Sequence, residues 1–525
     1  MVRLDGTSVM ARELLGNKAF GINSMRAMDL PVPPAFCLTT EVCARYFEYP
    51  DGCMDSVWPD VLVQLRWLEE QTGRTFGAGP LPLLVSVRSG AAQSMPGMLD
   101  TVLNLGFTDE VEKALAVLSA SEFAADTRRR FLDMYLRTVA GDEKAAVPAD
   151  AYQQLRSAVE AVFRSWTSDR AVAYRRHQGL SDSGGTAVII QAMVFGNLGA
   201  DSGTGVLFTR NPTTGAAEAL GEWLSGGQGE DVVSGAHDVS PVSELRQQQP
   251  LVFAELEAMA AKLEEYAGDV QDIEYTVESG RLWLLQTRNA KRSAQAAVRF
   301  ALQFHHEGHI DEVEVARRVT PEHIRALLLP SLQPEARMAA PLLASGLAAA
   351  PGVAAGRAYS DIDEAIDAAD EGEAVILVRS TTSPDDVEGM IAATGIVTEI
   401  GGATSHAAVV SREIGRPTVV GCGVGTAATL EGRLITVDGD NGEIRDGLLP
   451  LTAWSEADHP DLRELDALVR RVSPLLAHVD GDHRALDEVS PEAVTAAIEL
   501  GHRDVVSPSP LQAMLVAVRA TAAGH

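Results

Sequence analysis

Cysteine is scarce in this chain, and the features that would mark it for secretion or for a membrane are missing. Its four cysteines, Cys37, Cys43, Cys53 and Cys422, include no CxxC pair. So few cysteines indicate neither a disulfide framework nor a zinc site. The first residues, MVRLDGTSVM, lack the apolar core of a signal peptide, and no apolar run reaches the roughly 18 residues of a membrane span. The sequence therefore predicts a cytoplasmic protein with no membrane partner.

Basic residues are few relative to acidic ones. The chain has 43 Lys and Arg against 73 Asp and Glu, which gives a formal net charge of −30 at pH 7. A surface this acidic argues against nucleic acid and anionic membranes as partners, but it does not exclude a local basic pocket for phosphates. The 525 residues exceed what one hydrophobic core usually serves, so we expect three or four domains.

Strand and helix patterns alternate along the chain and predict an α/β multidomain fold. Strands are expected within residues 81–90, 186–194, 203–210 and 272–288. An Ala/Gly/Pro-rich stretch, residues 341–356, predicts a flexible linker. The patterns divide the chain into residues 1–290 with a helical insertion at about 109–180, a helical linker at 291–345, an α/β domain at 346–450 and a helical C-terminal segment at 451–525.

Two basic residues are surrounded by small ones. Lys18 follows LLGN, and Arg88 stands at the end of a predicted strand, within SVRSGAAQSMPGM. Small residues around a cation let backbone N–H groups approach phosphate oxygens. These positions are candidates for phosphate binding, and the alternative is a loop lysine with a salt-bridged arginine.

A predicted hairpin, residues 271–288, gathers polar side chains of complementary kinds. Glu274 and Gln286 lie on its facing strands, and Arg288 shares a face with Gln286 because alternate residues of a strand point the same way. A carboxylate and an amide oxygen beside an arginine suit Mg²⁺ with a polyphosphate, and Asp272 adds a second acid. The alternative is an exposed hairpin with a cross-strand charge pair.

One histidine, His406, stands at the predicted start of a helix in GGATSHAAVVSREIGRP. Thr404 or Ser405 is the candidate N-cap. The positive end of a helix lowers the pKa of a histidine, which keeps the imidazole neutral and nucleophilic, and it stabilises an anion placed on the ring. The position therefore suits a phosphohistidine better than a metal ligand. A capping or core histidine is the alternative.

Five long motifs occur in sequence order between residues 11 and 450: SVRSGAAQSMPGMLDTVLNLG, DSGTGVLFTRNPTTG, GQGEDVVSG, QDIEYTVESGRLWLLQTRNAKR and GGATSHAAVVSREIGRPTVVGCG. Together they resemble the pyruvate, phosphate dikinase family, with the related phosphoenolpyruvate (PEP) synthases and rifampin phosphotransferases. The resemblance implies an ATP-grasp nucleotide-binding domain, a helical linker and a swivelling phosphohistidine domain of the PEP-utilising mobile type.

The motif matches also imply roles for individual residues. They imply that His406 attacks ATP, that AMP leaves, and that Glu274 and Gln286 hold Mg²⁺. The implied nucleotide-binding residues are Lys18, Arg88, Gln191, Met193, Val194, Asp272, Glu274, Gln286 and Arg288, with supporting residues Glu230, Asp231, Thr404 and Ser405. Because a phosphohistidine domain must visit two sites, hinges are expected at residues 289–300 and 341–356.

Two departures from the family leave the acceptor of the phosphoryl group open. A (β/α)₈ barrel for pyruvate needs about 250 residues, and only about 75 follow the predicted histidine domain. Ile400 stands where dikinases carry an arginine. We expect transfer to pyruvate on a separate barrel subunit. The alternatives are a rifampin-type phosphotransferase acting on a metabolite or antibiotic, and a regulatory protein that binds ATP without turnover.

Overall fold

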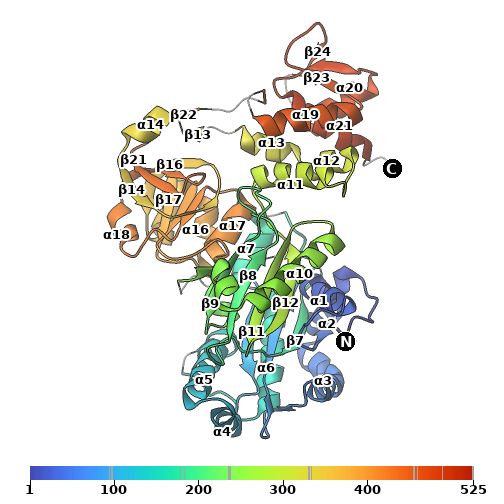
Figure 1. Cartoon of the computed structure of the whole chain (residues 1–525), viewed down its shortest axis with the longest axis vertical. Helices are drawn as coiled ribbons and strands as arrows, with labels where there is room; N and C mark the ends of the chain where they lie inside the picture. Colours follow the sequence, from blue (N-terminus) through green and yellow to red (C-terminus); the bar gives the residue numbers. More distant parts are fainter. Residues whose placement is uncertain are drawn as a thin grey trace.

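This computed structural model describes residues 1–522 apart from 94, 96–97, 143, 178, 183, 234–237, 329–330, 333, 453–455, 458 and 487–488. Figure 1 shows three lobes, which we call the N-terminal domain (blue to green), the histidine domain (yellow to orange, carrying helix α17) and the C-terminal domain (yellow-green and red). Helices and several separate sheets are both present, so the predicted α/β multidomain fold is confirmed.

Two five-stranded antiparallel sheets form the centre of the N-terminal domain. The first has the order β1 (Val2–Arg3), β2 (Ala35–Leu38), β7 (Ala187–Ala192), β5 (Val85–Gly90) and β6 (Thr101–Leu105). The second has the order β10 (Ser240–Pro241), β9 (Leu220–Ser225), β8 (Gly203–Phe208), β11 (Gln271–Glu278) and β12 (Arg281–Asn289). The strands expected from the sequence at these places are confirmed, including the hairpin of β11 and β12.

Helix α1 (Arg12–Ala27) contacts β5 and β7 of the first sheet and β12 of the second, so it lies where the two sheets meet. Its residues Leu15, Ala19 and Ile22 belong to a buried cluster that both sheets share. The other helices of this domain are α2 (Thr40–Glu48), α3 (Pro50–Thr72), α4 (Asp109–Leu118), α5 (Ser121–Tyr135), α6 (Ala151–Ser165), α7 (Asp169–His177), α8 (Gly229–Val233), α9 (Ser243–Gln248) and α10 (Pro250–Ala267), with two short strands, β3 (Thr75–Phe76) and β4 (Pro82–Leu83), and a π-helical turn at Leu136–Ala140.

The histidine domain is built on one eight-stranded sheet. Its order is β14 (Leu342–Ser345), β21 (Glu443–Asp446), β20 (Leu434–Asp438), β16 (Val353–Tyr359), β17 (Val375–Arg379), β18 (Gly395–Thr398), β19 (Thr418–Val420) and β15 (Leu347–Ala350). The four strands from β16 to β19 are parallel neighbours. Its helices are α15 (Ile362–Asp370), α16 (Val387–Ala392), α17 (His406–Ile414) and α18 (Thr426–Leu430), with a 3₁₀ turn at Pro384–Asp386 before α16.

The prediction of a flexible linker and hinge at residues 341–356 is wrong. Strands β14, β15 and the start of β16 occupy this stretch, and β14 and β15 form opposite edges of the sheet. Ala349 and Ala350 are buried, and a side chain at Gly346 would lie 2.4 Å from the carbonyl oxygen of Val420. Small residues here permit close strand packing, whereas low intrinsic strand preference of Ala and Gly hides the strands in the sequence.

The predicted helical linker and the predicted helical C-terminal segment pack into one domain. Helices α11 (Ala294–His306), α12 (Glu312–Arg318) and α13 (Pro321–Leu327) share one buried core with α19 (Pro460–Val472), α20 (Pro491–Glu499) and α21 (Pro510–Ala522). The segment is not helical throughout, because β23 (Leu476–His478), β25 (Asp504–Val506) and β24 (Arg484–Ala485) form a parallel sheet. Strands of two or three residues are too short to show a periodicity in sequence.

Two connections join the histidine domain to the C-terminal domain. Strands β13 (Ser331–Leu332) and β22 (Leu451–Thr452) pair antiparallel between these domains, and α14 (Pro334–Ala339) follows β13. At this paired connection, seen between the two upper lobes in Figure 1, the chain passes between the C-terminal domain and the histidine domain.

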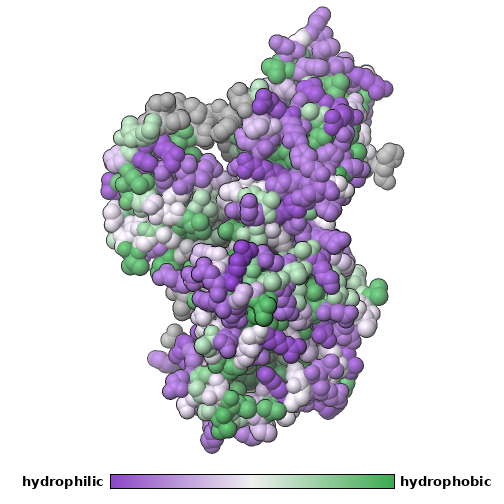
Figure 2. All heavy atoms as spheres, viewed as in Figure 1, coloured by the Kyte–Doolittle hydropathy of each residue, from purple (hydrophilic) through white to green (hydrophobic). Residues whose placement is uncertain are grey.

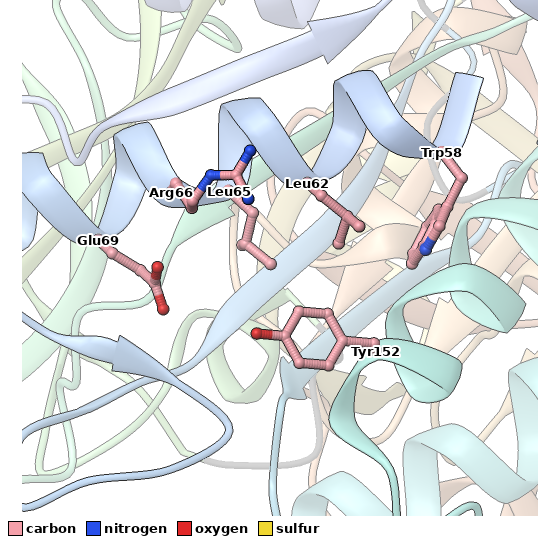
Figure 3. Close-up of a pocket in the computed structure, with 6 residues that line it drawn as sticks. All are labelled: Trp58, Leu62, Leu65, Arg66, Glu69 and Tyr152. Atoms are coloured by element: carbon pink, nitrogen blue, oxygen red, sulfur yellow. The ribbon is translucent and has the colours of Figure 1, made fainter. Parts of the chain in front are cut away.

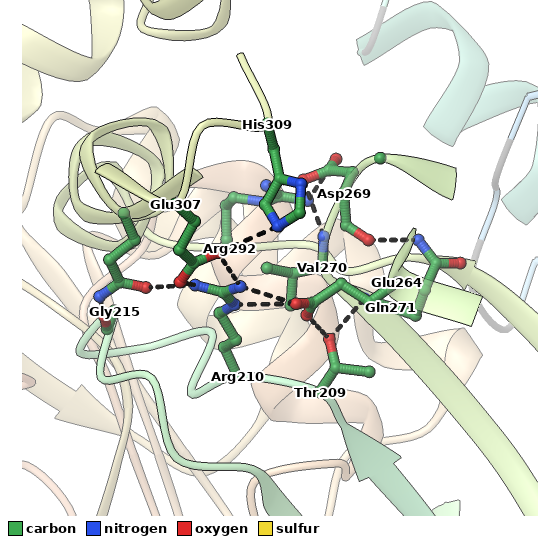
Figure 4. A network of polar contacts seen from close by, with 12 residues as sticks. Thr209, Arg210, Gly215, Glu264, Asp269, Val270, Gln271, Arg292, Glu307 and His309 are labelled. Atoms are coloured by element: carbon green, nitrogen blue, oxygen red, sulfur yellow. Dashed lines mark hydrogen bonds and ion pairs between the residues drawn. The ribbon is translucent and has the colours of Figure 1, made fainter. Parts of the chain in front are cut away.

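The segment after β12 is anchored to the N-terminal domain, which contradicts the expected hinge at 289–300. Arg210 follows β8, and its guanidinium binds Glu264 of α10 at 2.7 Å and Glu307 at the end of α11 at 2.7 Å (Figure 4). In the same network Arg292 binds Asp269 at 2.7 Å. These ion pairs fix the C-terminal domain to the N-terminal domain.

We expect Arg210→Met to lower the apparent free energy of unfolding by about 3 kcal/mol, because it leaves two neighbouring carboxylates without their buried cation. The Arg210 side chain is only 9% exposed. Equilibrium unfolding in urea measures the effect.

Arg246→Met is the matched control. Arg246 lies 4.5 Å from the ring centroid of Phe253. Like Arg210 it binds a glutamate, Glu257, at 2.9 Å, but its side chain is 62% exposed. An exposed pair contributes at most about 1 kcal/mol. Equal losses for the two variants would contradict the anchoring role of Arg210.

The outer surface is largely polar. In the view of Figure 2, hydrophilic residues dominate the C-terminal domain, and apolar residues are scattered in small groups over the other two. Within the described part of the chain, no helix combines the length and the hydropathy that crossing a bilayer requires.

Candidate functional site

Arg88, at the end of β5, is the centre of a polar cluster between the two sheets of the N-terminal domain. Its guanidinium donates to Glu274 Oε2 at 2.9 Å, to Gln286 Oε1 at 3.3 Å and to Gln191 Oε1 at 3.2 Å. It also donates to the carbonyl oxygen of Leu285 at 3.3 Å. The structure therefore brings together residues that are up to 198 positions apart.

The hairpin places the two proposed metal ligands side by side. Glu274 of β11 pairs directly with Gln286 of β12, and a bulge follows between Glu274 and Tyr275. Bulges redirect side chains and are common next to active sites. Carboxylate and amide oxygens are the ligand types that Mg²⁺ takes in proteins, so these two residues fit a magnesium ion.

Arg288 and Asp272 form a second ion pair one step along the hairpin. Arg288 Nε donates to Asp272 Oδ2 at 2.7 Å, and the two residues are direct cross-strand partners. Asp272 Oδ1 is buried and has no hydrogen-bond partner among the described residues. Burial raises the pKa of Asp272, and Arg288 opposes this. This carboxylate oxygen is therefore available as a further metal ligand beside Glu274.

Lys18 lies half-buried next to these charges. Burial lowers its pKa to about 7, with Arg88 acting in the same direction and Glu274 against it. Its position depends on Gly16, which has φ 73° and breaks α1 locally. A side chain at Gly16 would lie 1.9 Å from the carbonyl oxygen of Gly90, so only glycine permits this approach of α1 to the end of β5.

The cluster carries an excess of positive charge. Burial alone would raise the pKa of Glu274, but Arg88, Arg288 and Lys18 outweigh it and hold that pKa below the ordinary value. With Lys18 protonated, three cations face two carboxylates, Glu274 and Asp272. A water-poor cluster of this kind attracts an anion with several oxygens.

Three further residues implied for nucleotide binding, Gln191, Met193 and Val194, lie at the end of β7 and just after it. Gln191 of β7 is buried, and its amide is used at both ends: Oε1 accepts from Arg88, and Nε2 donates to the carbonyl oxygen of Pro33 at 3.2 Å. The backbone N–H of Met193 donates to Leu84 at 2.9 Å. Met193 and Val194 are both half-buried at the end of this strand.

Glu230 and Asp231 of α8 form a separate cluster around Arg130 of α5. Arg130 Nη1 donates to Glu230 Oε1 at 3.1 Å and to Asp231 Oδ1 at 2.7 Å. Burial raises the pKa of Glu230, and Arg130 opposes this. Sequence reasoning missed Arg130, because nothing marks one arginine of a helical insertion as the partner of residues 100 positions later.

His406 begins α17, as the sequence predicts. Ser405, not Thr404, is the N-cap, because its hydroxyl accepts from the backbone N–H of Ala408 at 3.4 Å. The ring Nδ1 lies 3.3 Å from the hydroxyl of Thr382, and Nε2 is buried without a partner among the described residues. Burial lowers the pKa of His406 to about 4, so the ring is neutral at pH 7. Sequence reasoning missed Thr382, which orients the ring.

The loop before His406 contacts the N-terminal domain. The Thr404 hydroxyl donates to the carboxylate of Glu222, a buried residue of β9. A side chain at Gly402 would lie 2.0 Å from Glu222 Oε1, so the Gly-Gly pair permits this close approach. Burial raises the pKa of Glu222, and the hydrogen bond from Thr404 opposes this.

The far end of α17 is held to the same domain. Lys291, just after β12, binds Glu413 at 2.7 Å, and the Glu413 side chain is only 9% exposed. The Arg412 guanidinium lies 5.7 Å from the ring centroid of Phe208, the last residue of β8. The charges of Asp272, Glu222 and Arg288 all act on the pKa of Arg412. The histidine helix is therefore docked beside the cluster of Arg88 and Glu274.

Two open cavities lie away from this cluster. One, of about 420 Å³, is lined by Trp58, Leu62 and other residues of α3, with Tyr152 of α6 facing them (Figure 3). The other, of about 520 Å³, lies where the N-terminal and C-terminal domains meet, beside Arg292, Arg318 and His323. None of the predicted site residues lines either cavity.

Known proteins match this chain in both regions of the site. Residues 53–252 and 238–309 match the family model "Pyruvate phosphate dikinase, AMP/ATP-binding domain", and residues 371–442 match "PEP-utilising enzyme, mobile domain". The first match contains Arg88, Glu274 and Arg288, and the second contains His406.

The similar proteins include pyruvate, phosphate dikinases from bacteria and from plants. The protein of Clostridium symbiosum is 40% identical over 493 residues, a match that covers 83% of this chain and 56% of that protein. The Rhizobium meliloti protein and pyruvate, phosphate dikinase 2 of Zea mays are also 40% identical, and each match covers 84% of this chain and 56% of the relative. The chain thus spans little more than half the length of these relatives.

Proposed function

Since the chain belongs to the pyruvate, phosphate dikinase family through its AMP/ATP-binding and mobile domains, we propose that it is an ATP-dependent phosphotransferase with a phosphohistidine intermediate. One observation carries the proposal. A neutral histidine with a free, buried Nε2 starts a helix that is docked beside three cations and two carboxylates.

The proposed reaction begins with attack of His406 Nε2 on the β-phosphorus of ATP. The bond between that phosphorus and the AMP oxygen breaks, and AMP leaves with the electron pair. The terminal phosphate then passes to inorganic phosphate or to water, which leaves one phosphoryl group on the ring. That group passes to the acceptor. Such a transfer requires an in-line approach of Nε2 to the phosphorus, and the docking of α17 beside the cluster supports the proposal.

The N-terminal cluster has three tasks in this proposal. Arg88, Arg288 and Lys18 neutralise and orient the phosphates. Glu274 and Gln286 would hold Mg²⁺, which shields the phosphate charge when it is bound. Asp272 holds Arg288 in place through the 2.7 Å ion pair.

The environment of His406 suits a nucleophile. Its pKa of about 4 means that lone-pair donation needs no prior deprotonation at pH 7. If Nδ1 carries the ring proton, it donates to Thr382 and leaves Nε2 free to attack. The first-turn N–H groups of α17 then face the phosphoryl group.

Lys18 should make the affinity for ATP depend on pH. In the free protein its pKa lies at about 7 instead of 10.5, so the ammonium that attracts ATP is lost as the pH rises through 7. We expect the ATP dissociation constant to rise up to about tenfold per pH unit above pH 7. Conversely, the nucleotide-free fold gains stability between pH 7 and 10.5, because the site holds the neutral amine. Isothermal titration calorimetry at pH 6 to 9 tests this.

Lys18→Met should bind ATP weakly and with little pH dependence over this range. Lys113→Met, which removes an exposed lysine of α4, should keep the wild-type profile. A wild-type profile that stays flat up to pH 9 would contradict the role of Lys18.

The acceptor is the second part of the proposal. We propose pyruvate as the acceptor, since the relatives are pyruvate, phosphate dikinases, and we propose that it is bound on a separate barrel subunit. Ile400, in place of the arginine of dikinases, favours the second candidate, a rifampin-type transfer to another small molecule. The histidine domain would reach either acceptor by swivelling about the paired connection of β13 and β22.

Labelled ATP tests both parts. With Mg²⁺ and β-labelled ATP, acid-labile label should accumulate on the protein, and γ-label should leave as phosphate or pyrophosphate. ATP binding without AMP formation would instead support a regulatory protein. Adding pyruvate together with a barrel subunit should discharge the label, whereas discharge by a small molecule alone would favour the second candidate.

A further inference from the structure

Three metal-binding side chains converge on the small parallel sheet of the C-terminal domain. His478 is the last residue of β23, and Asp504 is the first residue of β25. The register pairs Asp504 with Leu476, two residues before His478. Since alternate residues of a strand share a face, Asp504 and His478 lie on the same face. His483 immediately precedes β24, on the other side of β25.

The side chains approach one another closely. His478 Nε2 lies 2.9 Å from Asp504 Oδ1, and the His478 and His483 rings are stacked with their centroids 5.2 Å apart. One ligand atom of each residue lies within 4.8 Å of the other two. The side chains of His478 and Asp504 are 34% and 39% exposed, so solvent reaches the group.

The loop from β23 to β24 is shaped to hold His483 there. Gly481 has φ 134°, and a side chain at this position would lie 3.2 Å from Cδ2 of His483. His483 makes no hydrogen bond or ion pair with the described residues, so its place over His478 is not explained by a polar partner within the chain. Two stacked imidazoles beside a carboxylate offer nitrogen and oxygen lone pairs to a shared cation.

We propose that His478, His483 and Asp504 bind one divalent transition-metal ion of the Zn²⁺ or Co²⁺ type. Imidazole nitrogens and a carboxylate oxygen at about 2.0–2.2 Å are the ligands that zinc prefers. Tetrahedral ligand atoms at that distance from the ion lie about 3.4 Å from each other. The ligand atoms now lie within 4.8 Å of one another, so we expect side-chain rotation to bring them to the metal-bound separation. Water completes the coordination. The ion takes the place of the hydrogen bond between His478 Nε2 and Asp504 Oδ1, and the neutral His478 ring then carries its proton on Nδ1.

Metal binding would join the loop and two strands of the C-terminal domain. The sheet lies at the end of this domain that points away from the N-terminal domain in Figure 1. The site therefore stands apart from His406 and Arg88, and phosphorylation of His406 does not depend on it.

Titration of the metal-free full-length chain with Co²⁺ tests the proposal, with the visible absorption of bound Co²⁺ as the signal and Zn²⁺ as the competitor. We expect one ion per chain and a Zn²⁺-induced rise in melting temperature. Loss of a side chain that only supports a metal ligand weakens metal binding about 10–100-fold. Removal of one of the three coordinating side chains should weaken Co²⁺ binding at least as much. The variants are His483→Ala, which changes an exposed side chain, and Asp504→Asn.

His502→Ala is the matched control. His502 lies two residues before β25 and 3.4 Å from Arg484 of β24, but outside the three-residue group. It should bind Co²⁺ like the wild type. Melting in EDTA shows that each variant is folded. Absence of stoichiometric Co²⁺ binding to the wild type, or undiminished binding by both His483→Ala and Asp504→Asn, would overturn the site.

Discussion

His406→Ala should form no acid-labile phosphoenzyme from labelled ATP and should form AMP at least about 10⁴-fold more slowly than the wild type. The reason is that Nε2 of His406 is the proposed nucleophile, and loss of a nucleophile removes the covalent route altogether. The buried Nε2 without a partner and the pKa of about 4 support this assignment. Rapid-quench measurement of phosphoenzyme and AMP gives both readouts.

ATP binding separates this loss from a loss of folding. His406→Ala should bind ATP as the wild type does, because the contacts of the phosphates come from the N-terminal domain. His309→Ala is the matched histidine control, since His309 is 55% exposed and lies 3.7 Å from Glu307. Acid-labile label that persists in His406→Ala would refute the phosphohistidine.

Arg88→Lys should lower the rate of His406 phosphorylation by about 10²–10³-fold. The substitution keeps the charge, but one ammonium cannot reach the acceptors on Gln191, Glu274, Gln286 and Leu285 that the guanidinium spans at 2.9–3.3 Å. Glu274 and Gln286 then lose the donor that fixes their oxygens. Single-turnover phosphorylation at saturating ATP measures the effect.

Arg74→Lys makes the same chemical change at an arginine that lies between α3 and β3 and faces Glu278, the last residue of β11. Arg74 lies 3.9 Å from Glu278 and is 35% exposed, so we expect a rate within about twofold of the wild type. Similar losses in the two variants would mean that any arginine-to-lysine change beside β11 lowers the rate, and that the forked contact of Arg88 is not the cause.

Much of the proposed site follows from local sequence. The hairpin pattern predicts Glu274 and Gln286 on facing strands, and the structure has them as direct partners. The pairing of Asp272 with Arg288 was seen only in the structure. The helix start at His406 follows from Ser405 and the apolar run after it, and the structure confirms both. These features depend on neighbouring residues, so their periods and caps are visible in the chain itself.

Other parts depend on segments that meet only in the folded protein. Glu222 and Thr404 are 182 positions apart, and Arg130 and Glu230 are 100 apart. Each glutamate alone resembles any surface acid. The strands at 342–350 were hidden for a different reason, since Ala and Gly become strand residues only where a sheet edge needs small side chains.

By itself, the sequence determined which residues are proposed to carry the chemistry, because charge, lone pairs and helix-start signals are properties of single residues and short segments. The tertiary structure decided their environment. It partly buried Lys18 and His406, and this desolvation lowered their pKa values to about 7 and about 4, since desolvation arises only when distant segments exclude water. It also joined residues 294–327 and 460–522 into one core, because apolar faces of separate helices find their partners only through packing.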